Sequence, residues 1–160
     1  MTIEESLVRT ALATWKNNID RATRFFAGAS DARLQQEIAP GKNRLIYLWG
    51  HLIAVHDAML PLLGIGPRHY ADLDAAFLEG ADRAVDVTLS RDDLQTRWDA
   101  THAALQEAFD RFTAADWTAR HTVVSEADFA TNPLRNRLSV LLSRAGHVSY
   151  HLGQAVLAPK

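Results

Sequence analysis

Four long stretches of the sequence repeat apolar residues at helical spacing, and this pattern constrains the fold more than any other feature. The first stretch begins at Thr2, which forms a predicted capping box with Glu5. The last begins at Asn132 as the expected cap, with Pro133 at the first helical position. The four stretches cover about residues 2–28, 43–63, 90–112 and 132–157. Amphipathic helices bury their apolar faces against one another, so the sequence predicts an all-α four-helix bundle.

Two of the connections between these helices are long. Residues 64–87 follow the second helix, and we expect a short helix within them at about 72–78. Residues 114–131 precede the last helix, and their β-prone run at 121–124 predicts a short extended piece. Connections of this length in a compact domain are often functional. The first one is therefore a candidate lid.

Length and composition narrow the class of protein. The chain has 160 residues and 48% hydrophobic content, which is enough for one domain (1–160) with a core of its own. Its 17 basic and 19 acidic residues give a net charge of −2 and are spread along the chain, so we expect no nucleic-acid or membrane partner.

There is no cysteine, which excludes disulfides and a thiol nucleophile from the protein itself. The acidic N-terminus is unlike a secretion signal, so we expect a cytoplasmic protein.

The second predicted helix is long and apolar enough to resemble a membrane-spanning helix. Residues 45–66 are apolar except for His51, His56 and Asp57. An aspartate in the middle of a membrane helix costs about 2.5–3.5 kcal/mol. No other stretch of the chain offers a second span, so we interpret this one as the buried helix of a bundle, ended or kinked by Pro61.

Two histidines in the last helix form the clearest chemical motif. His147 and His151 are four positions apart, which places them about 40° apart around a helix and about 6 Å apart along it, so both rings can reach one cation. The alternative is a pair of interior imidazoles bonded to side chains or water. Val148 stands where a zincin has its glutamate, and Arg144 stands where a ferritin-like site has one, so neither pattern applies. Imidazole ligands suit zinc, nickel, copper or iron rather than magnesium or calcium.

A third nitrogen ligand has three candidates. His51 and His56 lie about 140° apart on the second helix, so only one of them can easily face the motif. His102 on the third helix is a competing ligand or an outer partner. Asp57 and Arg144 could orient a ligand or hold an anionic substrate, or they could be ordinary charges at the rim of the bundle. The helical pattern leaves these alternatives open.

The remaining histidines and large aromatic residues have ordinary structural explanations. His69 and His121 fall in the long connections, where we do not expect a direct role. Four aromatic residues are expected first in the core and only second as pocket walls: Trp15, Trp49, Trp98 and Tyr150.

Taken together, these residues resemble the DinB-like superfamily, which includes bacillithiol S-transferases, mycothiol-dependent maleylpyruvate isomerases and proteins described as metal-dependent hydrolases. The matching features are His51-Leu52 in the second helix and His147-x-x-x-His151 followed by Gly153-Gln154 in the last. The resemblance implies a four-helix bundle, often a homodimer, with a divalent metal held by three histidines. It selects His51, His147 and His151 as the ligands, in preference to His56 and His102.

Two classes of function follow from such a site. Three neutral imidazoles leave a cation its full charge and an open position, which suits a metal-dependent enzyme. Its nucleophile would be metal-activated water, in a hydrolase, or an external low-molecular-weight thiol, in an S-transferase acting on a small molecule. Zinc or nickel is the expected metal, with iron as the alternative. The competing hypothesis is a non-catalytic homodimeric bundle, either a metal-binding or stress-response protein or one whose histidines bind no metal.

Overall fold

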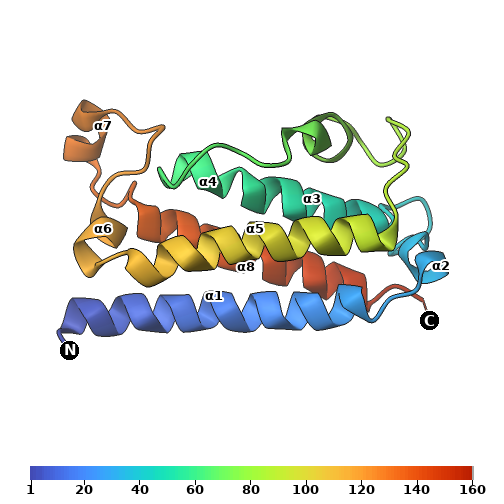
Figure 1. Ribbon diagram of the computed structural model, residues 1–160, viewed down its shortest axis with the longest axis horizontal. Coiled ribbons are helices and arrows are strands. Elements are labelled where there is room, and N and C mark those ends of the chain that lie inside the picture. The colour runs from blue at the N-terminus through green and yellow to red at the C-terminus, as the bar shows by residue number, and fades with distance from the viewer. Residues whose placement is uncertain (160) are drawn as a thin grey trace.

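The computed structural model describes residues 1–159, and these residues form helices and turns without any β-strand (Figure 1). Four long helices make up the bundle: α1 (Ile3–Ala27), α3 (Leu45–Asp57), α5 (Arg91–Arg111) and α8 (Arg137–Val156). Short helices occupy the connections: α2 (Asp31–Leu34), α4 (Met59–Leu62), η1 (Ala71–Leu73), η2 (Ala75–Glu79), α6 (Ala114–Thr118) and α7 (Glu126–Thr131). The predicted all-α four-helix bundle with two long connections is confirmed.

The long helices form two parallel pairs, α1 with α8 and α3 with α5, and the two pairs run in opposite directions (Figure 1). Asn18 Nδ2 donates to the Ala145 carbonyl at 3.0 Å, which joins α1 to α8. Because α3 and α5 point the same way, the chain must travel back along α3 before α5 can begin. Residues 63–90, called the return connection below, cover this distance and lie along α3 (Figure 1). The length of the connection is therefore a consequence of the topology.

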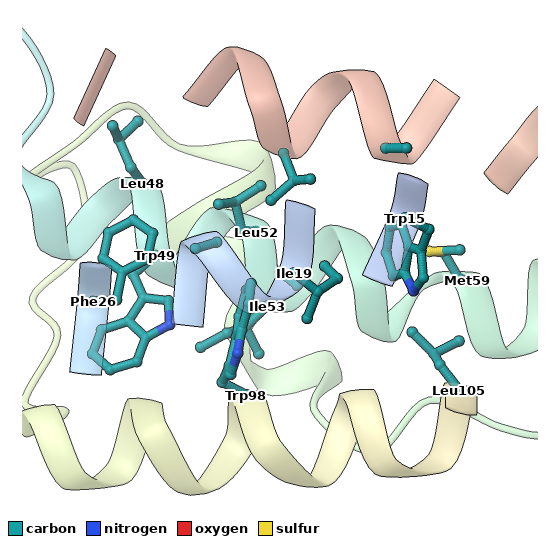
Figure 2. Packing of buried hydrophobic residues seen from close by; sticks show 14 of the residues in the cluster. Trp15, Ile19, Phe26, Leu48, Trp49, Leu52, Ile53, Met59, Trp98 and Leu105 are labelled. Atoms are coloured by element: carbon teal, nitrogen blue, oxygen red, sulfur yellow. The ribbon is translucent and has the colours of Figure 1, made fainter. Parts of the chain in front are cut away.

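The core lies between the four long helices and is rich in aromatic side chains where α1, α3 and α5 meet (Figure 2). Phe26 stacks on Trp49 with ring centroids 5.2 Å apart, and Trp15 and Trp98 are almost completely buried. Tyr150 was expected in this core, but 62% of its surface is exposed, because it points outward from α8. Within residues 1–159, one helical segment (Leu45–Leu62) is long and apolar enough to cross a membrane, and 72% of it is buried inside the bundle.

Proline chemistry explains how the second long helix ends. Pro61 lacks the N–H that would bond to the Asp57 carbonyl, and its ring crowds that carbonyl. The helix breaks at Ala58, and α4 carries the chain only as far as Leu62. The effect of Pro61 was predicted correctly.

Two local predictions for residues 114–136 are wrong. The run at 121–124 forms a turn, in which Val124 N donates to the His121 carbonyl at 3.2 Å, and helices α6 and α7 flank it. Asn132 ends α7, whereas Asn136 caps α8 by accepting from Ser139 N at 2.9 Å. The physical reason is capping. Thr113 and Ser125 each accept from an N–H three residues on, and so start short helices that outweigh the β propensity of the segment between them.

Candidate metal centre

Three histidines meet on the seam between α3 and α8. His51 comes from α3, and His147 and His151 project from successive turns of α8. One ring nitrogen from each lies within 4.8 Å of the others, and all three side chains are half-buried. His147 Nε2 is 3.2 Å from His51 Nε2 and 3.0 Å from His151 Nε2. The structure thus brings together the three residues that the family resemblance selects.

Hydrogen bonds behind the triad define the state of two of its rings. The Nδ1 atom of His51 lies 2.7 Å from the Phe77 carbonyl, and that of His151 lies 2.7 Å from Gln154 Oε1. Each of these oxygens can only accept, so each Nδ1 carries the proton and each Nε2 presents a lone pair. Histidine ligands of metals usually donate their second ring N–H to a carbonyl or carboxylate in this way.

The contacts among the three Nε2 atoms favour a cation. The lone pairs of His51 and His151 both face His147 Nε2. A single proton on that atom can be donated to only one of them, which leaves the other lone pair without a donor. A divalent ion accommodates all three nitrogens at once, and tetrahedral zinc sites commonly use such ligands. The residues present therefore fit a metal.

The pKa values of two triad histidines are lowered, which keeps their rings neutral and able to bind a metal. Burial lowers the pKa of His147 to about 4, with smaller contributions from His151, His51 and the charge of Arg144. Burial also lowers the pKa of His151. Histidine must be neutral to bind a metal, so the site is ready for one at neutral pH without losing a proton.

The return connection contacts the triad at His51. Phe77 lies in η2 and supplies the carbonyl behind His51, while the Tyr47 hydroxyl donates to the Gly80 carbonyl at 2.8 Å. Gly50 makes this close approach possible, because a Cβ there would lie 2.3 Å from Phe77 Cε1. The segment predicted as a candidate lid thus contacts a candidate ligand. The sequence gives no signal for the role of Phe77, which acts through its backbone.

The competing candidates lie elsewhere. His56 Nδ1 is 3.0 Å from His102 Nε2, and His102 Nδ1 donates to the Trp98 carbonyl at 2.7 Å. His56 is fully buried and His102 is partly buried. Asp57 is buried rather than at a rim, and its carboxylate accepts from Arg68 Nε at 3.0 Å and from two backbone N–H groups of the return connection. None of these three residues completes the triad. Asp57 instead fixes the return connection to α3.

Fold and site together define a helical-bundle protein with a three-histidine candidate metal centre. The chain belongs to the DinB superfamily, because the model of that family matches residues 14–155. The match covers α3 and α5 completely, α8 up to Ala155, the second half of α1, and all three histidines of the centre. No curated protein matched the chain. The family resemblance predicted from the histidine motifs is confirmed.

Proposed function

We propose that this protein is a divalent-metal-dependent enzyme that transfers a low-molecular-weight thiol to a small electrophilic molecule. The observation that carries this proposal is the composition of the centre. Among residues 1–159, three histidines converge there, and the residues best placed to act as a fourth ligand are engaged elsewhere. Structural zinc sites are closed by four protein ligands, whereas catalytic sites use three and keep one position open.

The chemistry of the donor set favours a thiol over water as the nucleophile. A divalent cation held by the triad lowers the pKa of a thiol or water molecule that reaches it. No carboxylate joins the three imidazoles in the described part of the chain, so the site lacks the side-chain base that metalloproteases use. A thiol, with a free pKa near 8.5, needs less assistance to ionise than water does. Zinc or nickel suits such imidazole ligands best, and iron is the alternative.

The residues of the chain have distinct roles in this proposal. His51, His147 and His151 would hold the cation, while Phe77 and Gln154 keep two of these rings in the tautomer that presents Nε2. The return connection contacts the centre at His51 and would restrict access by water on that side. In this proposal the histidines bind the cation, Phe77 and Gln154 orient the ligand rings, and the return connection shields the centre.

Turnover with and without thiol tests the reaction. Tag-free protein is loaded with zinc, nickel or iron(II), and its metal content is measured. It is then assayed on aryl halide and ester substrates. Thiol-dependent turnover that is lost in His151→Ala and retained in His69→Ala, an exposed histidine outside the centre, supports the proposal. Hydrolysis without thiol would establish a hydrolase instead. A metal-loaded protein without turnover on either substrate class would favour the non-catalytic alternative.

We also propose that the protein forms a homodimer. The outer face of α8 exposes large apolar side chains next to the centre, including Leu142 at 51% and Tyr150 at 62% exposure. A second copy is a suitable cover for such a face. Light scattering after size-exclusion chromatography measures the assembly, and Leu142→Glu should shift it toward the monomer. The cytoplasmic location stays a prediction.

A further inference from the structure

Arg144 and Arg137 both have a buried Nε atom without a partner, but Arg137 still donates through Nη1, whereas Arg144 has no such bond among residues 1–159. The Arg144 side chain is half-buried. Burial lowers the pKa of its guanidinium, and no carboxylate counteracts that effect. A partly desolvated cation without an acceptor is costly, and proteins rarely keep one without a use for it.

The other half-buried arginines each have an acceptor within the protein. Arg44 pairs with Asp82, Arg68 pairs with Asp57 and Asp74, and Arg137 donates to the Asp116 carbonyl. The remaining half-buried arginines in residues 1–159 likewise donate to oxygen atoms: Arg33, Arg91, Arg97 and Arg120. Arg144 thus has the donor capacity that the others use within the protein.

The groove beside Arg144 has a volume of about 300 Å³ and a mixed lining. Its apolar wall consists of Leu62, Val123 and Val140, and its polar residues are Ser139, Ser143 and His121. The Nδ1 atom of His121 is also buried and has no partner in the described chain. Two side chains that each have a buried nitrogen atom without a partner therefore line one groove.

Local structure explains why His121 lies there. Thr122 N donates to the Leu62 carbonyl at 3.0 Å, and Thr122 Oγ1 donates to the Pro61 carbonyl at 2.9 Å. These bonds hold the 121–124 turn against the end of α4, opposite the first half of α8. The groove is a product of this docked turn, which the sequence suggested would be extended.

We propose that this groove binds the carboxylate of a small organic acid, with the guanidinium of Arg144 as its anchor and the apolar part of the acid on Leu62 and Val140. A planar guanidinium matches a carboxylate in a two-bond geometry. Among residues 1–159, Arg144 is the only arginine or lysine that lines the groove, and burial and the nearby Arg135 lower the pKa of His121, which favours its neutral form. One positive charge suits a monoanion better than a doubly charged phosphate.

Arg144, in the wall of this groove, lies near one ligand of the candidate metal centre. Arg144 precedes His147 by three residues on α8, so the two side chains lie about 60° apart around the helix and about 4.5 Å apart along it. A molecule anchored at Arg144 would therefore hold its carboxylate near the triad, while its apolar part lies on the other side of Arg144, at Val140. This role as the acid-binding part of a substrate site rests on the proposed function, whereas the binding itself does not.

Binding of butyrate, with butyramide as its neutral counterpart, tests the groove directly. Chelator-treated protein is titrated with each compound, and amide chemical shifts are followed by NMR. Butyrate should bind with a Kd in the millimolar range, butyramide at least about tenfold more weakly, and Arg144→Gln should weaken butyrate binding by at least about tenfold. The matched control is Arg21→Gln, which removes the same charge from an exposed position on α1. Circular dichroism verifies that each variant is folded.

Several outcomes would overturn the proposal. These are equal binding of butyrate and butyramide, unchanged binding in Arg144→Gln, or shifts confined to residues outside the groove. Butyrate binding that requires added metal and survives Arg144→Gln would place the acid on the cation instead. Because the titration is made without metal, failure of the metal-centre proposal leaves its result unaffected. Loss of metal in His147→Ala with normal butyrate binding would separate the two sites.

Discussion

The histidine triad and the His56–His102 pair have similar distances between ring nitrogens, but only the triad is arranged to bind a metal. In the triad and in the pair, ring nitrogens approach to between 3.0 and 3.2 Å. In the pair, His102 donates to the Trp98 carbonyl, which leaves its Nε2 free to accept from His56 Nδ1, so one chain of protons satisfies the contact. In the triad, Phe77 and Gln154 occupy the outer nitrogens, and lone pairs face one another at the centre. Because His102 donates to a backbone carbonyl just as His51 does, the difference lies at the facing nitrogens: an N–H meets a lone pair in the pair, whereas two lone pairs face one atom in the triad.

The largest contrast between the clusters should appear in metal content. His147→Ala removes the nitrogen that the other two histidines face, so bound metal should fall from about one ion per chain to a negligible level. We expect an affinity loss greater than the roughly 100-fold that an outer partner can cause. Elemental analysis after equilibrium dialysis against zinc measures this. Equal metal content in the variant and the wild type would show that His147 is not a metal ligand.

The His56–His102 pair should instead show its effect in stability. His102→Ala leaves a cavity in the core and deprives the His56 N–H of its acceptor, so the free energy of unfolding should fall by about 2–4 kcal/mol. Urea denaturation of chelated protein measures this loss. Metal content should stay at the wild-type level, and a loss of metal would show that the pair supports the centre.

Gly50 offers a sharper test of how the return connection holds the triad. Gly50→Ala would place a methyl group 2.3 Å from the Phe77 ring, so η2 must shift and carry the carbonyl away from His51. The metal affinity should fall by about 10-fold to 100-fold. Gly146→Ala is the matched control, because a Cβ there meets nothing within 4 Å although it adjoins His147. Equal affinities for the two variants would show that the carbonyl of Phe77 does not orient the ligand.

The smallest effect concerns the pH dependence of stability. Burial lowers the pKa of His102 to about 4 in the folded protein, compared with 6.5 ordinarily. As the pH falls from 6.5 toward 4, the unfolded chain takes up a proton that the folded chain does not, so stability is lost by up to about 1.4 kcal/mol per pH unit. His102→Gln should reduce this slope, whereas the exposed His69→Gln should not. Urea midpoints between pH 7 and pH 5 on chelated protein provide the measurement, and identical slopes would contradict it.

The sequence predicted the long helices because their formation depends on nearby residues. The capping box of Thr2 and Glu5 and the effect of Pro61 are local interactions, and the helical spacing of apolar residues is enough to indicate a bundle. The position of His147 and His151 on one face also follows from helix geometry alone. Local signals failed at Asn132, because Asn136 is an equally suitable cap and the tertiary contacts of residues 119–137 favour it.

The sequence by itself therefore determined the helices, the core that they bury and a pair of histidines placed to share a cation. Only the tertiary structure decided that His51 joins this pair while His56 and His102 bond to each other. It also placed the carbonyl of Phe77 behind His51 and left Arg144 without an acceptor. The physical reason is that helix periodicity depends on residues close in sequence and determines only which side chains share a face. Which faces meet depends on the packing of α3 against α8 and α5, which are far apart in the sequence.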